Sequence, residues 1–433
     1  RRINVFDWDK EFPVIFDNGG FDVVIGNPPY GFHQIHKEIV KNYFKNNYIS
    51  SHGSYEHYFL FYESSLKLLN NNGYHGFIVP VTWLNIPSAL SLRKFILDNY
   101  FINEIIWLPE MVFENAKVNT LISIVTSFKT QKVLIKFIKK GINKLKSYKE
   151  KKISQLVFIE NDYNISIFQN TSDIKLINRM KKKSISLGEI AKPCSGYNPY
   201  EVGKGIAPNG NPHSKKTIQE KPYNSSYKKD ENYKPEIIGR NLSRYYIDLK
   251  NNRWIKYGPW LAAPRDPSNF NGQRILAQEI TGGKEKRIIA SYFENELYYS
   301  RDVIPIKIIN DFPSPYFLLG IINSFLISWY HHKTSPKAEK GLFPKVLVSD
   351  LKKLPIIKID INKQKYKNQH NKMVEMVSQM LETQKKYHSA KLENEKTIYK
   401  KHIDILDNQI DQLVYKLYGL TEEEIKIVEG KND

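Results

Sequence analysis

The sequence contains very little cysteine. Cys194 is the only one, so the chain can form no internal disulfide and supplies no cysteine-based zinc cluster. A single thiol is typical of a reducing compartment, and we expect a cytoplasmic protein. There is also no apolar run near the roughly 18 residues that a membrane span needs, and we expect no signal peptide. The chain begins with Arg1 and Arg2 instead of methionine, which predicts a piece of a longer polypeptide.

Acidic residues are few relative to basic ones. The 433 residues include 65 Lys and Arg against 45 Asp and Glu, which gives a formal charge of +20. Such a surplus favours a polyanionic partner, and nucleic acid is the leading candidate. Two alternatives stay open. AT-rich coding also enriches Lys, Asn, Ile and Tyr, and an anionic membrane surface would attract the same charge. The membrane is the weaker of these, because no strongly amphipathic basic helix stands out.

The first part of the chain alternates strand and helix patterns. Apolar runs at 21–26, 74–84, 102–109 and 119–128 predict strands, and the segments 54–73 and 88–100 predict helices. We expect the first run, FDVVIG, to be buried on both faces of a parallel sheet. The alternation predicts a doubly wound α/β sheet. The Lys-rich segment 129–154 is typical of an edge hairpin that leads into a linker.

The pattern changes along the rest of the chain. From about Ile185 to Pro355, short β-type runs, turns and aromatics replace helical periodicity, which predicts an irregular β-rich module. The tail at about 368–418 is helical, with one apolar seam at Tyr399, Ile403, Leu406, Ile410, Leu413 and Leu417. That seam predicts either a helical hairpin packed on its own module or a spacer or dimerisation arm.

The segment Asn27-Pro28-Pro29-Tyr30 follows the first strand, where ligands of open α/β sheets bind. Asn27 offers a side-chain carbonyl, and Pro28 offers a main-chain carbonyl whose direction is stiffened by Pro29. Tyr30 offers a flat ring. Two acceptors and a ring suit an exocyclic amine on a planar heterocycle. The acceptors would pull that amine toward sp3 geometry, so that it could attack an activated methyl group in line. A purely structural turn is the alternative.

The stretch FDVVIGNPPYG resembles motif IV of the adenine-N6 DNA methyltransferases of restriction–modification systems, in the TaqI-like gamma class. Residues 58–84 resemble the helix and strand that follow this motif, and residues 108–125 resemble motif VIII. The resemblance implies that Tyr30 and Phe113 stack on the two faces of a flipped adenine. Residues 5–22 resemble the lead-in of larger, Eco-type members that fuse restriction and modification. Release-factor glutamine methyltransferases share the motif, but they are short and lack a large basic β-rich module.

The resemblance also implies a methyl donor, S-adenosylmethionine, and no metal for the methyl transfer. In the family, the glycine-rich loop that binds this cofactor lies upstream of the motif, and nothing in residues 1–22 can serve as that loop. We therefore expect the main cofactor site to lie outside this chain. Phe61 falls where the family has an aromatic beside the cofactor adenine. A core phenylalanine on an amphipathic helix is the alternative for that residue.

Residues 185–355 loosely resemble a TaqI-like C-terminal specificity domain. Basic residues interleave there with aromatics, which suits phosphate contacts and groove packing. The predicted DNA contacts are Arg240, Arg244, Arg253, Lys256, Lys284 and Arg287. The alternative is an aromatic core with a solvated basic face. His331 and His332 are expected to be polar loop residues or phosphate donors, and no carboxylate cluster convincingly predicts a nuclease.

Together these features predict an α/β chain. It has a partial Rossmann-like methyltransferase sheet (1–160), an irregular β-rich α+β target-recognition domain (161–360) and a C-terminal helical hairpin (361–433). The expected function is site-specific adenine-N6 methylation of double-stranded DNA in a restriction–modification system. The alternatives are a non-catalytic recognition fragment or subunit that needs an upstream half, and part of a fused restriction–modification endonuclease. Expected partners besides DNA are a missing N-terminal half or a restriction subunit, and no membrane.

Overall fold

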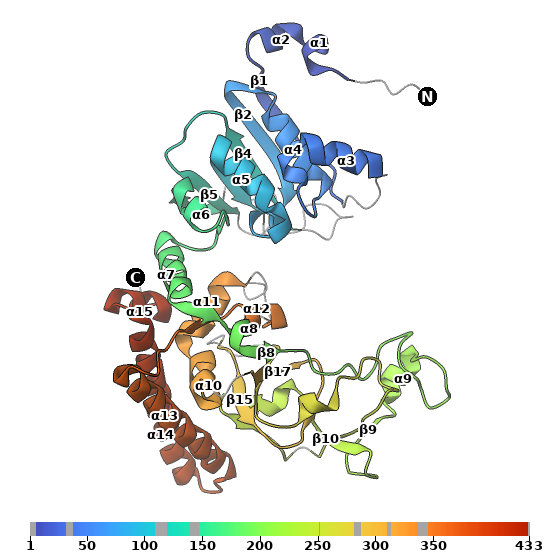
Figure 1. Cartoon of the computed structure of the whole chain (residues 1–433), viewed down its shortest axis with the longest axis vertical. Coiled ribbons are helices and arrows are strands. Elements are labelled where there is room, and N and C mark those ends of the chain that lie inside the picture. The colour runs from blue at the N-terminus through green and yellow to red at the C-terminus, as the bar shows by residue number, and fades with distance from the viewer. Residues whose placement is uncertain are drawn as a thin grey trace. The chain divides into compact units, whose positions relative to one another are not determined.

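The computed structural model describes residues 6–31, 38–108, 119–138, 147–250, 252–280, 287–309, 313–335 and 345–431. The chain divides into two compact units, Arg1–Lys175 and Leu176–Asp433 (Figure 1). None of the described helices is both long and apolar enough to cross a bilayer.

The first unit is built on a mixed six-stranded sheet with the order β1-β2-β4-β3-β5-β6. Strand pairs β1/β2 and β3/β5 are parallel, and the other neighbours are antiparallel. The final pair, β5 and β6, is the edge hairpin that the Lys-rich segment predicts. The strands are β1 Phe21–Gly26, β2 Leu69–Pro80, β3 Phe101–Trp107, β4 Thr120–Thr126, β5 Val133–Ile138 and β6 Tyr148–Ile153.

The strand β1 corrects one prediction. Among the strands that the structure describes, it lies at an edge of the sheet and pairs only with β2. Its apolar side chains are open, with Val23 57% and Ile25 78% exposed. The expectation that FDVVIG is buried on both faces is therefore wrong for this structure. The apolar pattern identified a strand, but it could not tell whether a neighbour covers that strand.

Helices α4 and α5 pack against the sheet of the first unit, α4 on β2 and α5 on β3 (Figure 1). The helix predicted at 54–73 ends earlier, at Leu66, and the Asn-rich turn belongs to β2 instead. Residues Val81–Leu84, expected in a strand, form a 3-10 turn. The helices are α1 Trp8–Glu11, α2 Pro13–Asp17, α3 Glu38–Asn47, α4 His57–Leu66, α5 Leu90–Asn99, α6 Gln155–Glu160 and α7 Thr171–Lys182, which contains the boundary between the units.

The second unit contains the irregular β-rich region that the sequence predicts. Its sheets have the orders β16-β10-β13-β9, β11-β12, β15-β14-β17-β8 and β18-β7. The strands are β7 Ser184–Ser186, β8 Ala191–Pro193, β9 Asn224–Ser225, β10 Tyr233–Ile237, β11 Leu242–Ser243, β12 Tyr246–Ile247, β13 Trp254–Lys256, β14 Arg274–Gln278, β15 Ala290–Phe293, β16 Tyr298–Tyr299, β17 Val303–Ile308 and β18 Pro355–Ile357.

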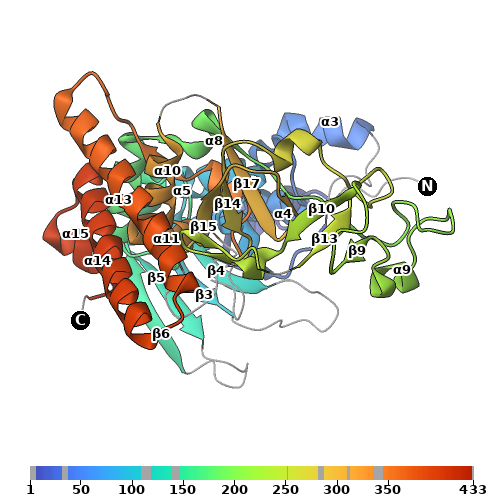
Figure 2. The ribbon, with the colours of Figure 1, turned by 90° about the horizontal axis from the view of Figure 1, so that it is seen from below.

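The helical tail is a hairpin of two 26-residue helices, α13 and α14, which lie side by side (Figures 1 and 2). Its seam residues from Ile403 to Leu417 are buried in one core with the β-rich region, so the hairpin packs on its own unit. Gly419 ends α14 in the left-handed conformation, and Thr421 caps α15. The helices are α8 Leu187–Ile190, α9 Lys215–Glu220, α10 Pro315–Asn323, α11 Phe325–Thr334, α12 Val348–Lys352, α13 Gln364–Ser389, α14 Glu393–Tyr418 and α15 Glu422–Glu429.

The predicted fold class is confirmed, with one omission. Helices α10 and α11 pack in the core of the second unit, where the sequence predicted no helix. Both are apolar around most of their circumference, and α10 has seven buried residues among nine. A helix buried on all sides loses the amphipathic period by which helices are recognised.

Candidate active site and nucleic-acid interface

The NPPY loop begins directly after the carboxyl end of β1. Gly26 closes that strand opposite Phe77 of the parallel neighbour β2. A Cβ atom at position 26 would lie 3.2 Å from the Phe77 ring, so glycine allows the strand end and the ring to approach. The loop continues from Asn27 to Gly31 along the end of the sheet, which is the place where open α/β sheets bind ligands.

Tyr30 is held firmly in this loop. Its hydroxyl donates a 3.0 Å hydrogen bond to the carbonyl oxygen of Ile78 in β2. Its ring packs edge to face on Tyr58 of α4, with 6.0 Å between the ring centroids. Half-burial raises the pKa of Tyr30, so the phenol stays neutral at physiological pH. The ring is thus a fixed, uncharged surface.

The residues before Tyr30 differ in exposure. Asn27 and Pro29 are exposed, and Pro28 is buried. No hydrogen bond to the Asn27 side chain is found within the part of the chain that the structure describes, so its amide is open to a ligand. On the other side of Tyr30, the carbonyl oxygen of Gly31 accepts a 3.0 Å hydrogen bond from the amide of His57. That bond fixes the end of the loop to the start of α4.

The start of α4 brings residues to the loop that the motif alone does not predict. Glu56 occupies the N-cap position of the helix without a capping hydrogen bond from its side chain, and burial raises the pKa of its carboxyl group. Tyr58 is fully buried against Tyr30, and burial together with the charge of Glu56 raises its pKa. Their segment, SYEHYF, is some 25 residues away in sequence. Sequence spacing therefore gives no signal of this contact, which requires the parallel β1/β2 crossover.

The other predicted site residues of the first unit have different outcomes. Phe113 lies outside the described residues, so its stacking role stays a prediction. Phe61 is on α4 with 49% of its surface exposed, whereas its neighbours Leu60 and Tyr62 are buried. The interpretation of Phe61 as a core residue is therefore wrong. Its ring is open to a ligand, as a role beside the cofactor would require.

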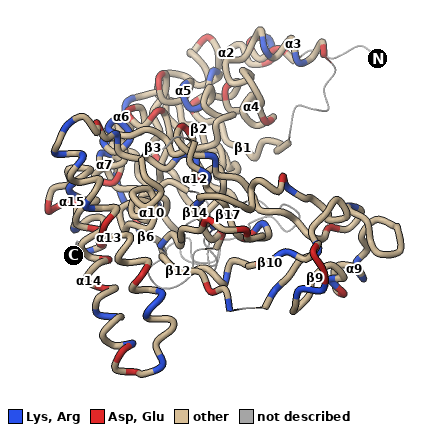
Figure 3. The backbone as a smooth tube through the Cα atoms, turned by 60° about the horizontal axis from the view of Figure 1, so that its bottom comes forward, with Lys and Arg blue, Asp and Glu red and all other residues tan. Residues whose placement is uncertain are grey.

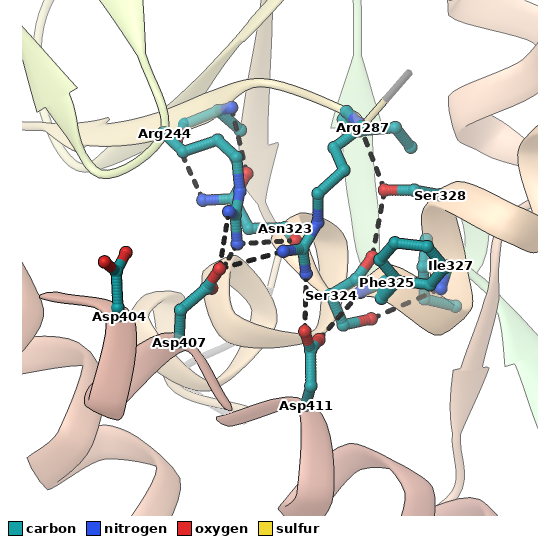
Figure 4. A network of polar contacts seen from close by, with 12 residues as sticks. Arg244, Arg287, Asn323, Ser324, Phe325, Ile327, Ser328, Asp404, Asp407 and Asp411 are labelled. Carbon is teal, nitrogen blue, oxygen red and sulfur yellow. Dashed lines mark hydrogen bonds and ion pairs between the residues drawn. The ribbon is translucent and has the colours of Figure 1, made fainter. Parts of the chain in front are cut away.

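Two of the predicted DNA contacts in the second unit have internal partners (Figure 4). Arg244 forms a bidentate ion pair with Asp407 of α14. Arg287 contacts Asp407 at 2.8 Å and Asp411 at 2.7 Å. Asp411 also accepts the backbone amide of Phe325 at 2.7 Å. We name these four charged side chains the hairpin clamp, because they join α14 to the β-rich core.

The electrostatics of the hairpin clamp follow from its burial. Burial opposes ionisation of Asp407, but hydrogen bonds and charge from Arg244 and Arg287 outweigh it and lower the pKa. For Asp411 burial prevails and the pKa is raised. Arg287 retains only 7% of its side-chain surface. A DNA contact by Arg244 or Arg287 stays a prediction, and their internal partners weigh against it.

The remaining predicted cations are placed differently. Arg253 pairs at 3.0 Å with Glu236, which is buried and also accepts the Tyr197 hydroxyl. Arg240 is exposed at the start of a 3-10 turn, and Lys256 lies at the end of β13. Neither has a carboxylate within ion-pair distance among the described residues, so both can reach a phosphate. Lys284 lies outside those residues.

The two parts of the chain match two known families. Residues 1–113 match the Eco57I restriction-modification methylase family, and residues 234–356 match the TaqI-like C-terminal specificity domain. The chain is therefore similar in its first part to N6-adenine methylases of restriction–modification systems and in its second part to their specificity domains. The resemblance predicted from the NPPY motif is confirmed. Enzymes of this family use S-adenosylmethionine as the methyl donor.

Known relatives match different shares of the chain. A putative type II restriction enzyme and methyltransferase of Methanocaldococcus jannaschii is 28% identical over 426 residues, covering 96% of this chain and 33% of the relative. The chain thus spans one third of that relative's length. A type II methyltransferase of Thermus thermophilus is 36% identical over 109 residues, covering 24% of this chain and 25% of the relative.

A solved structure shares the fold. The type IIL restriction-modification enzyme MmeI, determined in complex with DNA, superposes with a TM-score of 0.57 at 12% identity. The match covers 98% of this chain and 57% of MmeI. At this identity the likeness concerns the fold alone.

Within the specificity domain, the adjacent histidines correct a further prediction. His331 and His332 lie on α11, not in a loop. His331 is buried, and its Nε2 atom is 3.5 Å from Asp350. In the described ranges, no three His, Cys, Asp or Glu side chains gather in a way that could hold a metal ion.

Charge is mixed on the helical hairpin beside this domain. Acidic and basic positions are interspersed along α13 and α14 (Figure 3). Several of these pairs are exposed ion pairs within one helix, such as Lys386 with Glu382 and Lys400 with Asp404. The hairpin therefore does not present a uniformly basic face to a polyanion.

Proposed function

We propose that this chain carries the base-binding half of a site-specific adenine-N6 DNA methyltransferase, and that the second unit selects the DNA sequence. The observation that carries the proposal is the NPPY loop itself. An exposed Asn27 amide, a stiffened Pro28 carbonyl and a fixed Tyr30 ring lie together at the end of a parallel strand. This chemistry suits the amine and the ring of an adenine.

The mechanism follows from these residues. The target adenine leaves the duplex, because its N6 amine is otherwise engaged in base pairing. Its ring stacks on Tyr30, and Phe113 supplies the second face. Asn27 Oδ1 and the Pro28 carbonyl oxygen each accept a hydrogen bond from one N–H group of the amine. These two bonds localise the nitrogen lone pair and direct it toward the methyl group. S-adenosylmethionine, when bound, supplies the electrophilic methyl group, and Phe61 would contact its adenine.

The difference between the two edges of the sheet supports the hypothesis that a second, cofactor-binding segment pairs with β1. The far edge strand, β6, carries the exposed Lys149, Glu150 and Lys152, and charges of this kind protect a true edge from further pairing. The near edge strand, β1, instead exposes Val23 and Ile25. An apolar, unprotected edge favours pairing with another strand. We propose that this strand comes from the segment that binds S-adenosylmethionine.

The proposal is tested by methyl transfer in the intact enzyme that contains these residues. Asn27→Ala removes one amine acceptor, so we expect a loss of at least 100-fold in methylation of duplex DNA with DNA affinity nearly unchanged, as for removal of one preorganised polar group. Asn85→Ala, outside the loop, serves as the control. Wild-type activity of Asn27→Ala would overturn the mechanism.

A second candidate function is sequence-specific DNA recognition without catalysis by this chain alone. The open β1 edge favours it, because the chain by itself offers no partner strand there within the described residues. Calorimetry on the chain alone tests whether it binds DNA, S-adenosylmethionine or both. The chain alone should bind duplex DNA in a salt-dependent manner and S-adenosylmethionine negligibly, whereas micromolar affinity for S-adenosylmethionine would contradict the need for a second segment.

A further inference from the structure

The second unit contains an aromatic groove that the methylation chemistry does not use. Its volume is about 490 Å³, which is within the range of small-molecule sites. We name it the Trp260 groove. The side chains that matter here are Pro208, Pro222, Tyr223, Tyr233, Lys256 and Trp260. Flat or rigid apolar surfaces thus form the walls, and one ammonium group lies among them.

The walls of the Trp260 groove are fixed before any ligand arrives. The indole nitrogen of Trp260 donates a 2.9 Å hydrogen bond to the carbonyl oxygen of Lys256. The hydroxyl of Tyr223 donates to the carbonyl oxygen of Ile206. Gly258 lies so close to the indole that a Cβ atom there would be 2.3 Å from the ring. These polar ends are satisfied by backbone. Tyr223 is buried with 8% of its surface exposed, so the partly exposed indole of Trp260 is the main ring surface open to a ligand.

Two cations border the groove. Lys256 Nζ lies 5.3 Å from the centroid of the Trp260 ring, and Lys229 Nζ lies 5.7 Å from the centroid of Tyr233. Across the described parts of the chain, neither ammonium group has a carboxylate within 4 Å. Other lysines of the same region do, since Lys228 contacts Glu231 at 2.8 Å and Lys234 contacts Glu296 at 3.1 Å. The unpaired positive charge is thus concentrated where the aromatic surface is.

We propose that the Trp260 groove binds an unpaired nucleotide of DNA. The base packs against the aromatic walls, and Lys256 and Lys229 contact the flanking phosphates. A base inside a duplex has neighbours on both faces, so only an unstacked base can use these surfaces. Because the indole nitrogen of Trp260 and the hydroxyl of Tyr223 are already bonded to backbone, the site discriminates little between bases. DNA as the partner rests on the proposed function, but methyl transfer itself needs no second nucleotide site.

The proposal is tested with the whole chain and a fluorescently labelled 12-nucleotide oligothymidylate, with fluorescence anisotropy as the readout. Trp260→Ala should weaken single-strand binding about 5- to 100-fold, the range for loss of one stacking partner. Trp260→Phe keeps a ring and should retain most of the affinity. Lys256→Gln should weaken binding and reduce the slope of log affinity against log salt by about 1.

A matched control lies in the first unit. Tyr148 is exposed, and Lys136 Nζ lies 5.0 Å from its ring centroid, so Tyr148→Ala removes a similar aromatic–cation pair outside the groove. We expect no change in oligonucleotide affinity. Wild-type binding by both Trp260→Ala and Lys256→Gln would overturn the proposal. Equal weakening for the oligonucleotide and for a 12-base-pair duplex would also overturn it, as would tighter binding of a proline-rich peptide than of the oligonucleotide.

The Asn27→Ala variant separates this proposal from the proposed function. It should bind the oligonucleotide as the wild type does, because Asn27 is in the other unit. If Asn27→Ala loses methyl transfer while the Trp260 and Lys256 variants bind normally, the groove proposal fails and the methyltransferase proposal stands. If the groove variants lose binding while Asn27→Ala methylates normally, the reverse holds.

Discussion

The two units of this chain differ in which residues they leave exposed and which they pair internally. The first unit leaves an apolar strand, β1, open at one edge of its sheet and protects the other edge with charged residues. The second unit uses charge internally, and its hairpin clamp joins the helical tail to the β-rich core. From this difference we infer that the exposed apolar residues of β1 indicate a binding partner. An excess of basic residues, by contrast, does not by itself indicate a DNA-binding surface.

The largest expected effect is the loss of the hairpin clamp. Asp407→Ala leaves Arg244 and Arg287 close together without their shared carboxylate. Removing one partner of a buried ion pair costs roughly 3–5 kcal/mol, and we expect the free energy of unfolding to fall by about 3 kcal/mol in urea denaturation. Asp404→Ala is the matched control on the same helix, since its ion pair with Lys400 is exposed. It should cost less than about 0.5 kcal/mol. Equal losses for both variants would show that the clamp does not hold the hairpin.

The next effect is acid sensitivity of the first unit. His75 in β2 is fully buried, and burial lowers its pKa to about 3 from 6.5. The unfolded chain therefore binds a proton that the folded unit rejects. Stability is complete above pH 6.5 and falls as the pH drops toward 3, by about 1.4 kcal/mol per unit. We expect a loss of about 2 kcal/mol between pH 6.5 and 5.

The side chain of His75 forms a 2.8 Å hydrogen bond with the hydroxyl of Ser65. His75→Gln tests that assignment, because glutamine keeps a polar group beside Ser65 and does not titrate. Hydrogen exchange of the β2 amides at pH 6.5 and pH 5 is the measurement, since it reports on the first unit alone. The variant should show nearly the same protection at both values. An unchanged pH dependence would mean that other groups cause the acid sensitivity.

Sequence reasoning succeeded where a pattern is local. The NPPY motif identified the family, and the heptad-like seam from Ile403 to Leu417 identified the hairpin and its packing face. It does not reach features that depend on distant partners. Arg244 and Arg287 are basic residues among aromatics, as in a DNA-binding surface, and only the fold brings Asp407 and Asp411 to them from at least 120 residues away. The exposure of β1 also depends on distant segments, so the local sequence pattern does not predict it.

The smallest expected effect on stability is that of a substitution in the open edge strand β1. This substitution compares the two edges of the sheet directly. Ile25→Lys replaces a side chain that is 78% exposed, so the stability of the chain alone should change by less than about 0.5 kcal/mol. The same lysine would place a charge beside the side chains of the proposed partner strand, because side chains of paired strands lie next to one another on the faces of a sheet. We expect it to reduce methyl transfer by the intact enzyme at least tenfold, because a charge on an edge strand opposes pairing. Tyr148→Lys on β6, at the opposite edge of the same sheet, should change neither property. If both variants behave alike, the two edges are equivalent, and the apolar character of β1 is not the mark of a missing strand.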